Sequence, residues 1–153
     1  MDAAGRRQQI VDEIVARTGI DDAMIERLVR GFYAKVREDA LLGPVFAARI
    51  ADWEPHLKQM CAFWSSVALI TGRYEGRPMQ KHLPLPIDGR HFDRWLALFA
   101  ETATELCPAA AARHFVERAE RIAESLETGI AVGNGIPLRR GERLHRPELE
   151  SAQ

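Results

Sequence analysis

Apolar residues recur at helical spacing along most of the chain, and no segment shows the strict alternation of a strand. The clearest stretch begins at Asp21 and Asp22, two good N-cap residues, and reaches Glu38. Its apolar residues lie three and four positions apart: Ile25, Leu28, Val29, Phe32 and Val36. Further helices are predicted over residues 6–18, from Asp52 to about Val67, from Asp88 to Pro108, and from Ala109 to about Leu126. The pattern therefore predicts an all-α fold.

The ends of the chain differ from its middle. Residues 6–18 form a short apolar stripe before the first capped helix, which predicts an N-terminal helical extension over residues 1–20. The main domain is expected over residues 21–131. Beyond it, glycines, prolines and charged residues alternate without a helical period. Residues 132–153 are therefore predicted to form a flexible polar tail, because they cannot bury enough apolar surface.

Composition narrows the class of protein. The 153 residues carry a formal net charge of -1, which argues against a nucleic-acid-binding surface. No apolar run approaches the roughly 20 residues that a membrane span needs, and no signal peptide is visible. Cys61 and Cys107 are too few for a disulfide framework and lie in apolar helical patterns. We therefore expect a cytoplasmic protein without membrane or nucleic-acid partners.

His82 lies in a short segment bounded by prolines. Pro78 suits the first turn of a helix, whereas Pro84 and Pro86 prevent the helix from continuing. The imidazole is thus attached to a rigid helical turn, and the carbonyl of Pro78 is the natural acceptor for its second nitrogen. Such a histidine can serve as an axial metal ligand. The alternative is an ordinary histidine at a helix end.

Apolar and aromatic faces surround this histidine on helices that are distant in the sequence. His56, Met60 and Phe63 share one helix face, and the Gly-Pro corner before residue 50 should return Phe46 to the core. An iron ligand on a short element, flat apolar walls and a few polar groups describe a haem pocket.

The same residues occur in motifs that resemble those of a known family. The motifs are Phe32-Tyr33-x-Lys35-Val36-Arg37, Leu42-Gly43-Pro44-Val45-Phe46, Trp53-x-x-His56, Phe63-Trp64, Gly72-x-Tyr74-x-Gly76-x-Pro78, Lys81-His82-Leu83-x-Leu85-Pro86 and Phe92-x-x-Trp95-Leu96. In this order and spacing they resemble the truncated haemoglobins, and within them group III. The similarity extends from about Asp21 to Leu126, roughly two-thirds of the chain.

The resemblance implies a globin-like, two-over-two helical sandwich around haem b, with His82 as the proximal iron ligand. It also implies that Tyr33 donates a hydrogen bond to the iron-bound ligand and that the indole of Trp95 lies across the pocket. His56 matches the distal histidine of some group members, and Phe46 matches an aromatic residue that packs on the haem.

Residue chemistry adds further expectations for the pocket. Tyr33 and Trp95 are the polar-tipped aromatic residues on apolar helix faces, so they suit a polar distal site. Met60 and Phe63 would cover the cofactor. Lys81, next to the proximal histidine, is expected either to pair with a haem propionate or to remain solvated.

The remaining histidines have other expected roles. His91 stands at a helix start, where a positive charge is unfavourable, so a neutral, hydrogen-bonded ring is predicted. His114 lies on a largely polar helix face and His145 in the tail, and both are expected to be solvated.

The leading functional hypothesis is a haem protein that binds the diatomic ligands O₂, CO and NO. A polar distal set favours redox chemistry, such as NO dioxygenation or peroxide reduction, over reversible transport, and such chemistry requires a reductase. Whether the protein is an enzyme stays open. One alternative is a helical interaction or sensor module without haem. A carboxylate-bridged metal site in a helical bundle is a weaker third hypothesis.

Overall fold

The computed structural model describes residues 2–150, and these form seven α-helices and one short 3₁₀ helix, with no strand among them. The helices are α1 (Ala3–Thr18), α2 (Asp22–Glu38), α3 (Gly43–Ala47), α4 (Trp53–Leu69), α5 (Pro78–His82), α6 (Gly89–Leu106), α7 (Ala109–Gly133) and η1 (Pro147–Leu149). The predicted all-α fold is confirmed.

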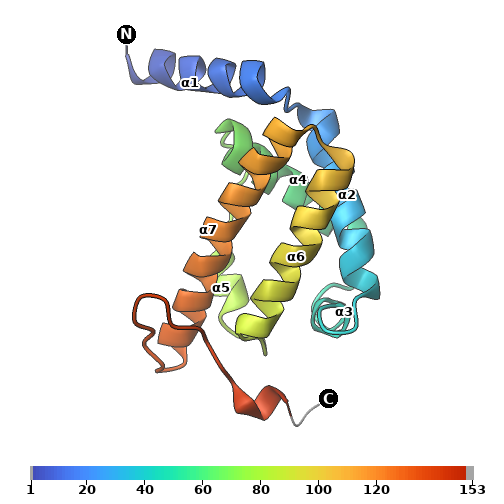
Figure 1. Ribbon diagram of the computed structural model, residues 1–153, viewed down its shortest axis with the longest axis vertical. Coiled ribbons are helices and arrows are strands. Elements are labelled where there is room, and N and C mark those ends of the chain that lie inside the picture. The colour runs from blue at the N-terminus through green and yellow to red at the C-terminus, as the bar shows by residue number, and fades with distance from the viewer. Residues whose placement is uncertain (1, 151–153) are drawn as a thin grey trace.

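The four long helices of the main domain pack as two pairs. Helices α6 and α7 lie side by side, and α2 and α4 form the second pair behind them (Figure 1). Contacts of α2 with α6 and of α4 with α7 join the two layers. The short helices α3 and α5 lie near the lower end of the bundle as drawn. This arrangement is the expected two-over-two helical sandwich.

Capping residues set the helix boundaries where the sequence predicts them. The side chains of Asp21, Asp52 and Asp88 accept hydrogen bonds from the first turns of α2, α4 and α6. Gly19 ends α1 in the left-handed conformation, with φ of 71°. Pro78 is the first residue of α5. The short helix that carries His82 is therefore fixed at its start by local sequence.

Aromatic stacking forms the centre of the core. Phe99 of α6 stacks on Trp64 of α4, with ring centroids 4.8 Å apart, and on Trp95 of its own helix at 5.5 Å. Phe32 of α2 meets both Phe99 and Trp95 edge-on. These contacts connect three helices and fix the orientation of the Trp95 indole.

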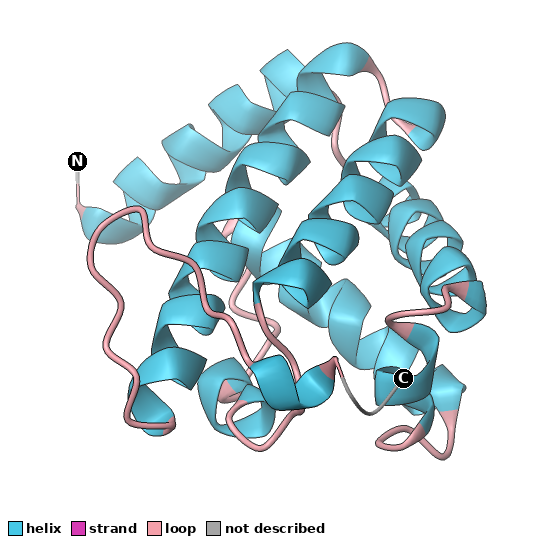
Figure 2. Cartoon of the chain, turned by 60° about the horizontal axis from the view of Figure 1, so that its bottom comes forward, coloured by secondary structure: helices cyan, strands magenta, loops and turns pink. Residues whose placement is uncertain are grey.

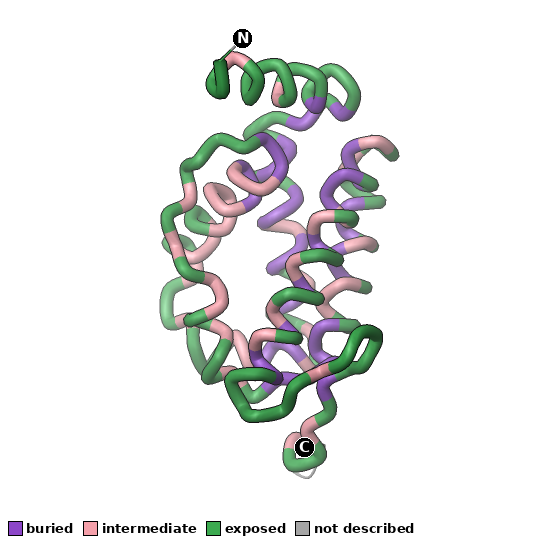
Figure 3. The backbone as a smooth tube through the Cα atoms, turned by 90° about the vertical axis from the view of Figure 1, so that its left-hand side faces the viewer, coloured by how far each residue is buried: buried purple, intermediate pink, exposed green. Residues whose placement is uncertain are grey.

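The C-terminal end of helix α1 packs on the bundle. Ile14 and Thr18 are buried, whereas most of the preceding turns are exposed (Figure 3). None of the helices formed by residues 2–150 is long and apolar enough to cross a membrane.

Helix α7 extends further than the sequence indicates. The helical period weakens after Leu126, yet the helix continues to Gly133. Its glycines provide room for α5: a Cβ atom on Gly129 would meet the Met79 side chain, and one on Gly133 would lie 2.8 Å from Leu83 Cδ2. These glycines therefore let Met79 of α5 and Leu83 pack closely against the last turns of α7, and Gly129 does not end the helix.

The described part of the tail follows a defined path over the bundle. It returns as a long loop across the end of the bundle to η1 (Figure 2). Leu144 is only 2% exposed, and Gly89 N–H donates to its carbonyl at 2.8 Å. Arg143 pairs with Glu127 of α7 and Asp93 of α6. Ion pairs with distant acidic residues thus hold a segment whose own apolar content is low.

Replacing Phe99 with alanine is expected to lower the free energy of unfolding by about 3–5 kcal/mol, because it removes a buried ring from the centre of the stack. Leu106→Ala on the same helix, where the side chain is 40% exposed, should cost about 1 kcal/mol or less. Urea unfolding of the protein without cofactor measures both values. Equal losses in the two variants would contradict the central role of Phe99.

Candidate functional site

A cavity of about 380 Å³ lies between the two helix pairs. It falls within the usual size range of small-molecule sites, and its walls are mostly apolar. All the residues expected at the site line it: Tyr33, Phe46, His56, Met60, Phe63, Lys81, His82 and Trp95. They come from α2, α3, α4, α5 and α6. Folding therefore brings together residues that are distant in the sequence.

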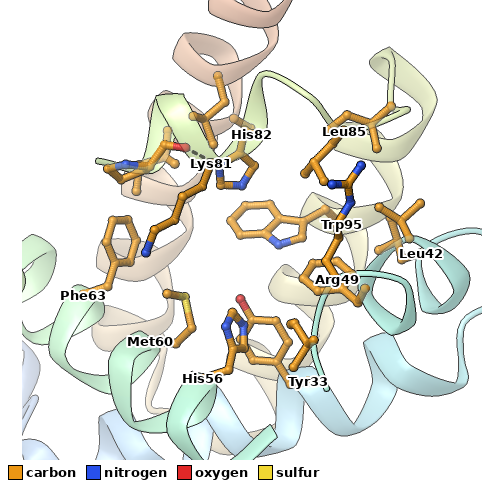
Figure 4. Close-up of a pocket in the computed structure, with 18 of the residues that line it drawn as sticks. Tyr33, Leu42, Arg49, His56, Met60, Phe63, Lys81, His82, Leu85 and Trp95 are labelled. Carbon is orange, nitrogen blue, oxygen red and sulfur yellow. Dashed lines mark hydrogen bonds between the residues drawn. The ribbon is translucent and has the colours of Figure 1, made fainter. Parts of the chain in front are cut away.

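His82 projects from the end of α5 into the cavity (Figure 4). Its Nδ1 lies 2.6 Å from the carbonyl oxygen of Pro78, the predicted acceptor. Because a carbonyl only accepts hydrogen bonds, Nδ1 carries the proton and Nε2 keeps a free lone pair. Burial lowers the pKa of His82, and the nearby Lys81 acts in the same direction, whereas the Pro78 hydrogen bond opposes them. The ring is therefore neutral near pH 7 and has a ligand-type nitrogen.

Tyr33 faces His82 from the opposite wall. Its side chain is 5% exposed, and its ring meets those of His56 and Phe46 at centroid distances of 5.2 and 5.8 Å. The hydroxyl points into the cavity, toward Trp95 and His82 (Figure 4). Burial raises the pKa of the Tyr33 phenol well above its ordinary value. The hydroxyl is thus a hydrogen-bond donor at physiological pH.

His56 has a buried nitrogen without a partner. Its Nε2 makes no hydrogen bond within the part of the chain that the structure describes. Burial lowers the pKa of His56, and the positive charge of Lys81 lowers it further, so the ring is neutral. Leaving such a polar atom unpaired is costly. Because His56 lines the cavity beside Tyr33, a bound ligand could provide the missing partner.

Trp95 forms a side wall between His82 and Tyr33. Stacking on Phe99 and the edge contact with Phe32 hold its ring. The indole nitrogen points toward the side of the cavity that carries Tyr33 (Figure 4). Two N–H or O–H donors therefore converge opposite the face that carries His82.

The cavity lining is positively charged. Lys81 and Arg49 contribute to it, and no carboxylate is present among the described lining residues. Arg49 donates to the Pro84 carbonyl at 3.3 Å. This charge balance suits a ligand that is apolar in its centre and anionic at its edge.

Sequence reasoning missed Arg49 and the position of His91. Arg49 follows Phe46 by three residues, a spacing that places both on one side of a helical turn and could have indicated it. His91 is neutral and hydrogen-bonded as predicted: Asp88 N–H donates to its Nδ1 at 3.1 Å, and burial lowers its pKa. That His91 also lines the cavity was not foreseen.

The expectation of a solvated His114 is wrong. Its side chain is 2% exposed in the core, and its Nε2 lies 3.1 Å from the Ala68 carbonyl at the end of α4. The adjacent Ala111 and Ala112 are buried too. Alanine is only weakly hydrophobic, so the sequence pattern does not mark this face of α7 as buried.

The described residues offer no ligand set for a carboxylate-bridged metal site. Between residues 2 and 150, no three His, Cys, Asp or Glu side chains lie close enough together to bind one metal ion.

A two-over-two helical bundle with one histidine on a short helix, facing polar groups across an apolar cavity, defines a globin.

Comparison with known proteins agrees with this class. A family model described as bacterial-like globin matches residues 16–127. The chain is 34% identical over 113 residues to the group 3 truncated hemoglobin ctb of Campylobacter jejuni, a match that covers 71% of this chain and 89% of that protein. It is 29% identical over 80 residues to the group 2 truncated hemoglobin YjbI of Bacillus subtilis, covering 51% of this chain and 61% of that protein.

The fold is similar to that of a solved relative. The crystal structure of group III truncated hemoglobin from Campylobacter jejuni superposes with a TM-score of 0.68 at 34% identity, covering 71% of this chain and 89% of that one. The chain belongs to the truncated haemoglobins, in group III. Membership implies a haem cofactor and diatomic gas ligands.

The residues present fit a haem. His82 offers a free Nε2, because Nδ1 is engaged by the Pro78 carbonyl. Lys81 and Arg49 give the lining two cationic side chains, without a carboxylate among the described lining residues, and this charge fits a cofactor with an anionic edge. The unpaired Nε2 of His56 is a polar group that a ligand opposite His82 could satisfy.

Stability of the protein without cofactor should decrease as pH falls from about 7 to about 5. Burial lowers the pKa of His56, His82, His91 and His114, so the unfolded chain binds more protons in this range. Their contribution is fully present above the unfolded pKa of about 6.5 and is lost as pH falls through the lowered folded values.

Urea unfolding at a series of pH values measures this slope. His114→Gln is expected to reduce it, because the amide can still donate to the Ala68 carbonyl but does not titrate. A stability independent of pH over this range would show that the buried histidines are not held neutral, and an unchanged slope in the variant would remove His114 from the set.

Proposed function

We propose that the protein binds haem b with His82 as the axial ligand and holds O₂, CO or NO on the opposite side. The observation that carries the proposal is the 2.6 Å contact between His82 Nδ1 and the Pro78 carbonyl, which orients Nε2 into the cavity. A haem bound there supplies a ferrous iron that binds diatomic gases. The globin domain is taken as residues 21–131.

The cavity lining suits a cofactor that is apolar over most of its surface and anionic at one edge. Met60, Phe63 and Phe46 give the space between His82 and Tyr33 apolar walls. We expect Lys81 and Arg49, which both line the cavity, to pair with the propionates. Such charge-assisted hydrogen bonds select an anionic edge and leave the macrocycle against apolar side chains.

The polar groups opposite His82 favour tight retention of O₂. Tyr33 and Trp95 offer donors in a cavity with mostly apolar walls, and the neutral His56 is a third polar group nearby. Tight retention suits redox chemistry, such as NO dioxygenation or peroxide reduction, better than bulk transport. We propose such an enzymatic role for the protein in the cytoplasm, together with a reductase that returns the iron to the ferrous state.

His82→Ala is expected to abolish the normal axial ligation, because it removes the ring that the Pro78 carbonyl orients. The variant should lose haem or bind it without the ferrous spectrum of the wild type, and added imidazole should partly restore that spectrum. His145→Ala, which changes an exposed tail residue, is the control. An unaltered ferrous spectrum in His82→Ala would place the ligand elsewhere.

Tyr33→Phe and Trp95→Phe are each expected to speed O₂ release by about tenfold or more, because a hydrogen bond to a partly charged ligand contributes about 1.5–3 kcal/mol. Stopped-flow release measures the effect. Tyr74→Phe is a matched control, since this tyrosine lies against Phe63 at the edge of the cavity. Release rates that match the wild type in both variants would refute a polar ligand site.

A further inference from the structure

The connector between α5 and α6, residues 83–87, determines how His82 is joined to the rest of the bundle. It contains Pro84 and Pro86, which have no backbone N–H and prevent regular helix or strand pairing. Its internal hydrogen bonds are Leu85 N–H to the His82 carbonyl and Ile87 N–H to the Leu85 carbonyl, both 3.0 Å. So short a proline-rich loop depends on donors from elsewhere to fix its carbonyls.

Arg146 in the C-terminal tail supplies donors to two of these carbonyls, and Arg49 donates to a third, that of Pro84, at 3.3 Å. One guanidinium nitrogen donates to the Leu85 carbonyl at 3.0 Å and to the Ile87 carbonyl at 3.3 Å. The Arg146 side chain is 17% exposed. Its backbone N–H also donates to Asp88 Oδ2 at 3.1 Å, at the N-cap of α6. One residue therefore holds the connector at two carbonyls and also contacts the N-cap of the helix that follows.

The tail is itself anchored next to this contact. Arg143 pairs with Glu127 at 2.9 Å and with Asp93 at 2.7 Å, and Leu144 N–H donates to Glu127 at 2.8 Å. Gly89 provides space for it: a Cβ at this position would lie 3.1 Å from the Leu144 carbonyl oxygen. The tail thus fits closely against the start of α6 and the inner side of α7.

The contacts extend to the wall of the cavity. Leu144 packs in one cluster with Ile87, Phe92 and Ala123, which line the cavity, and Leu85 packs against the same cluster. Movement of the tail would therefore displace the wall beside His82. The matched family region ends at residue 127, so Arg143, Leu144 and Arg146 lie beyond it.

We propose that Arg146 is a positioning residue for the proximal histidine: by holding the carbonyls of Leu85 and Ile87 it sets the orientation of His82. The C-terminal tail is then a clamp on the proximal side of the haem site. This inference rests on the proposed function for its effect on haem, whereas the clamp on the connector is a property of the protein alone.

Arg146→Ala tests the proposal, with Arg140→Ala as the matched control. Arg140 is an exposed arginine of the same tail, without a hydrogen bond or ion pair in the described residues. Hydrogen–deuterium exchange of the protein without haem should accelerate about tenfold in residues 83–89 of Arg146→Ala, since charge-assisted hydrogen bonds are lost. Arg140→Ala should exchange like the wild type.

Resonance Raman spectroscopy of the ferrous, ligand-free holoprotein gives the second measurement. The iron–histidine stretching band should shift or broaden in Arg146→Ala and remain at the wild-type position in Arg140→Ala. A general loss of stability would not by itself move this band in folded protein. Should the alanine variant fail to fold, Arg146→Lys carries the test, with a smaller shift expected because an ammonium lacks the planar guanidinium.

The proposal is overturned if exchange in the connector is the same in Arg146→Ala and Arg140→Ala, or if the band in the folded Arg146 variant coincides with that of the wild type. If the protein binds no haem, the proposed function fails. The exchange measurement still decides whether Arg146 holds the connector.

Discussion

The hydrogen bond between His82 Nδ1 and the Pro78 carbonyl is the constraint on which the site depends. It forms within a single helical turn, so the proline that opens α5 also provides the acceptor that orients the ring. Burial keeps the imidazole neutral by lowering its pKa. The histidine thus has the tautomer and charge state of a metal ligand before any cofactor binds, which reduces the reorganisation needed on binding.

The long helices provide the other walls of the cavity and the polar groups opposite His82. Phe99 stacks between Trp64 and Trp95 and so fixes the indole that faces the cavity, while Tyr33 projects from the neighbouring layer. The two walls of the cavity are therefore built differently. One wall is a short segment between prolines that is held by arginines, and the other is part of the aromatic core.

Much of this arrangement could be predicted from the sequence, because helical periodicity and capping are local properties. Asp21 and the prolines around His82 mark their own boundaries, and the motif resemblance adds the roles expected for Tyr33 and Trp95. Pairing between distant charges leaves no local pattern. Arg143 of the tail pairs with Glu127 of α7, a contact that no local spacing indicates, so the path of the tail could not be foreseen.

The central claim is that this cavity is a haem site with one axial histidine. Titration of the cofactor-free protein with haemin, followed by its absorption spectrum, tests it most directly. The account predicts that an intense Soret band grows to saturation at one haem per chain and that reduction gives the spectrum of a histidine-ligated ferrous haem. A titration without a saturable Soret band would contradict the account and favour a helical interaction or sensor module.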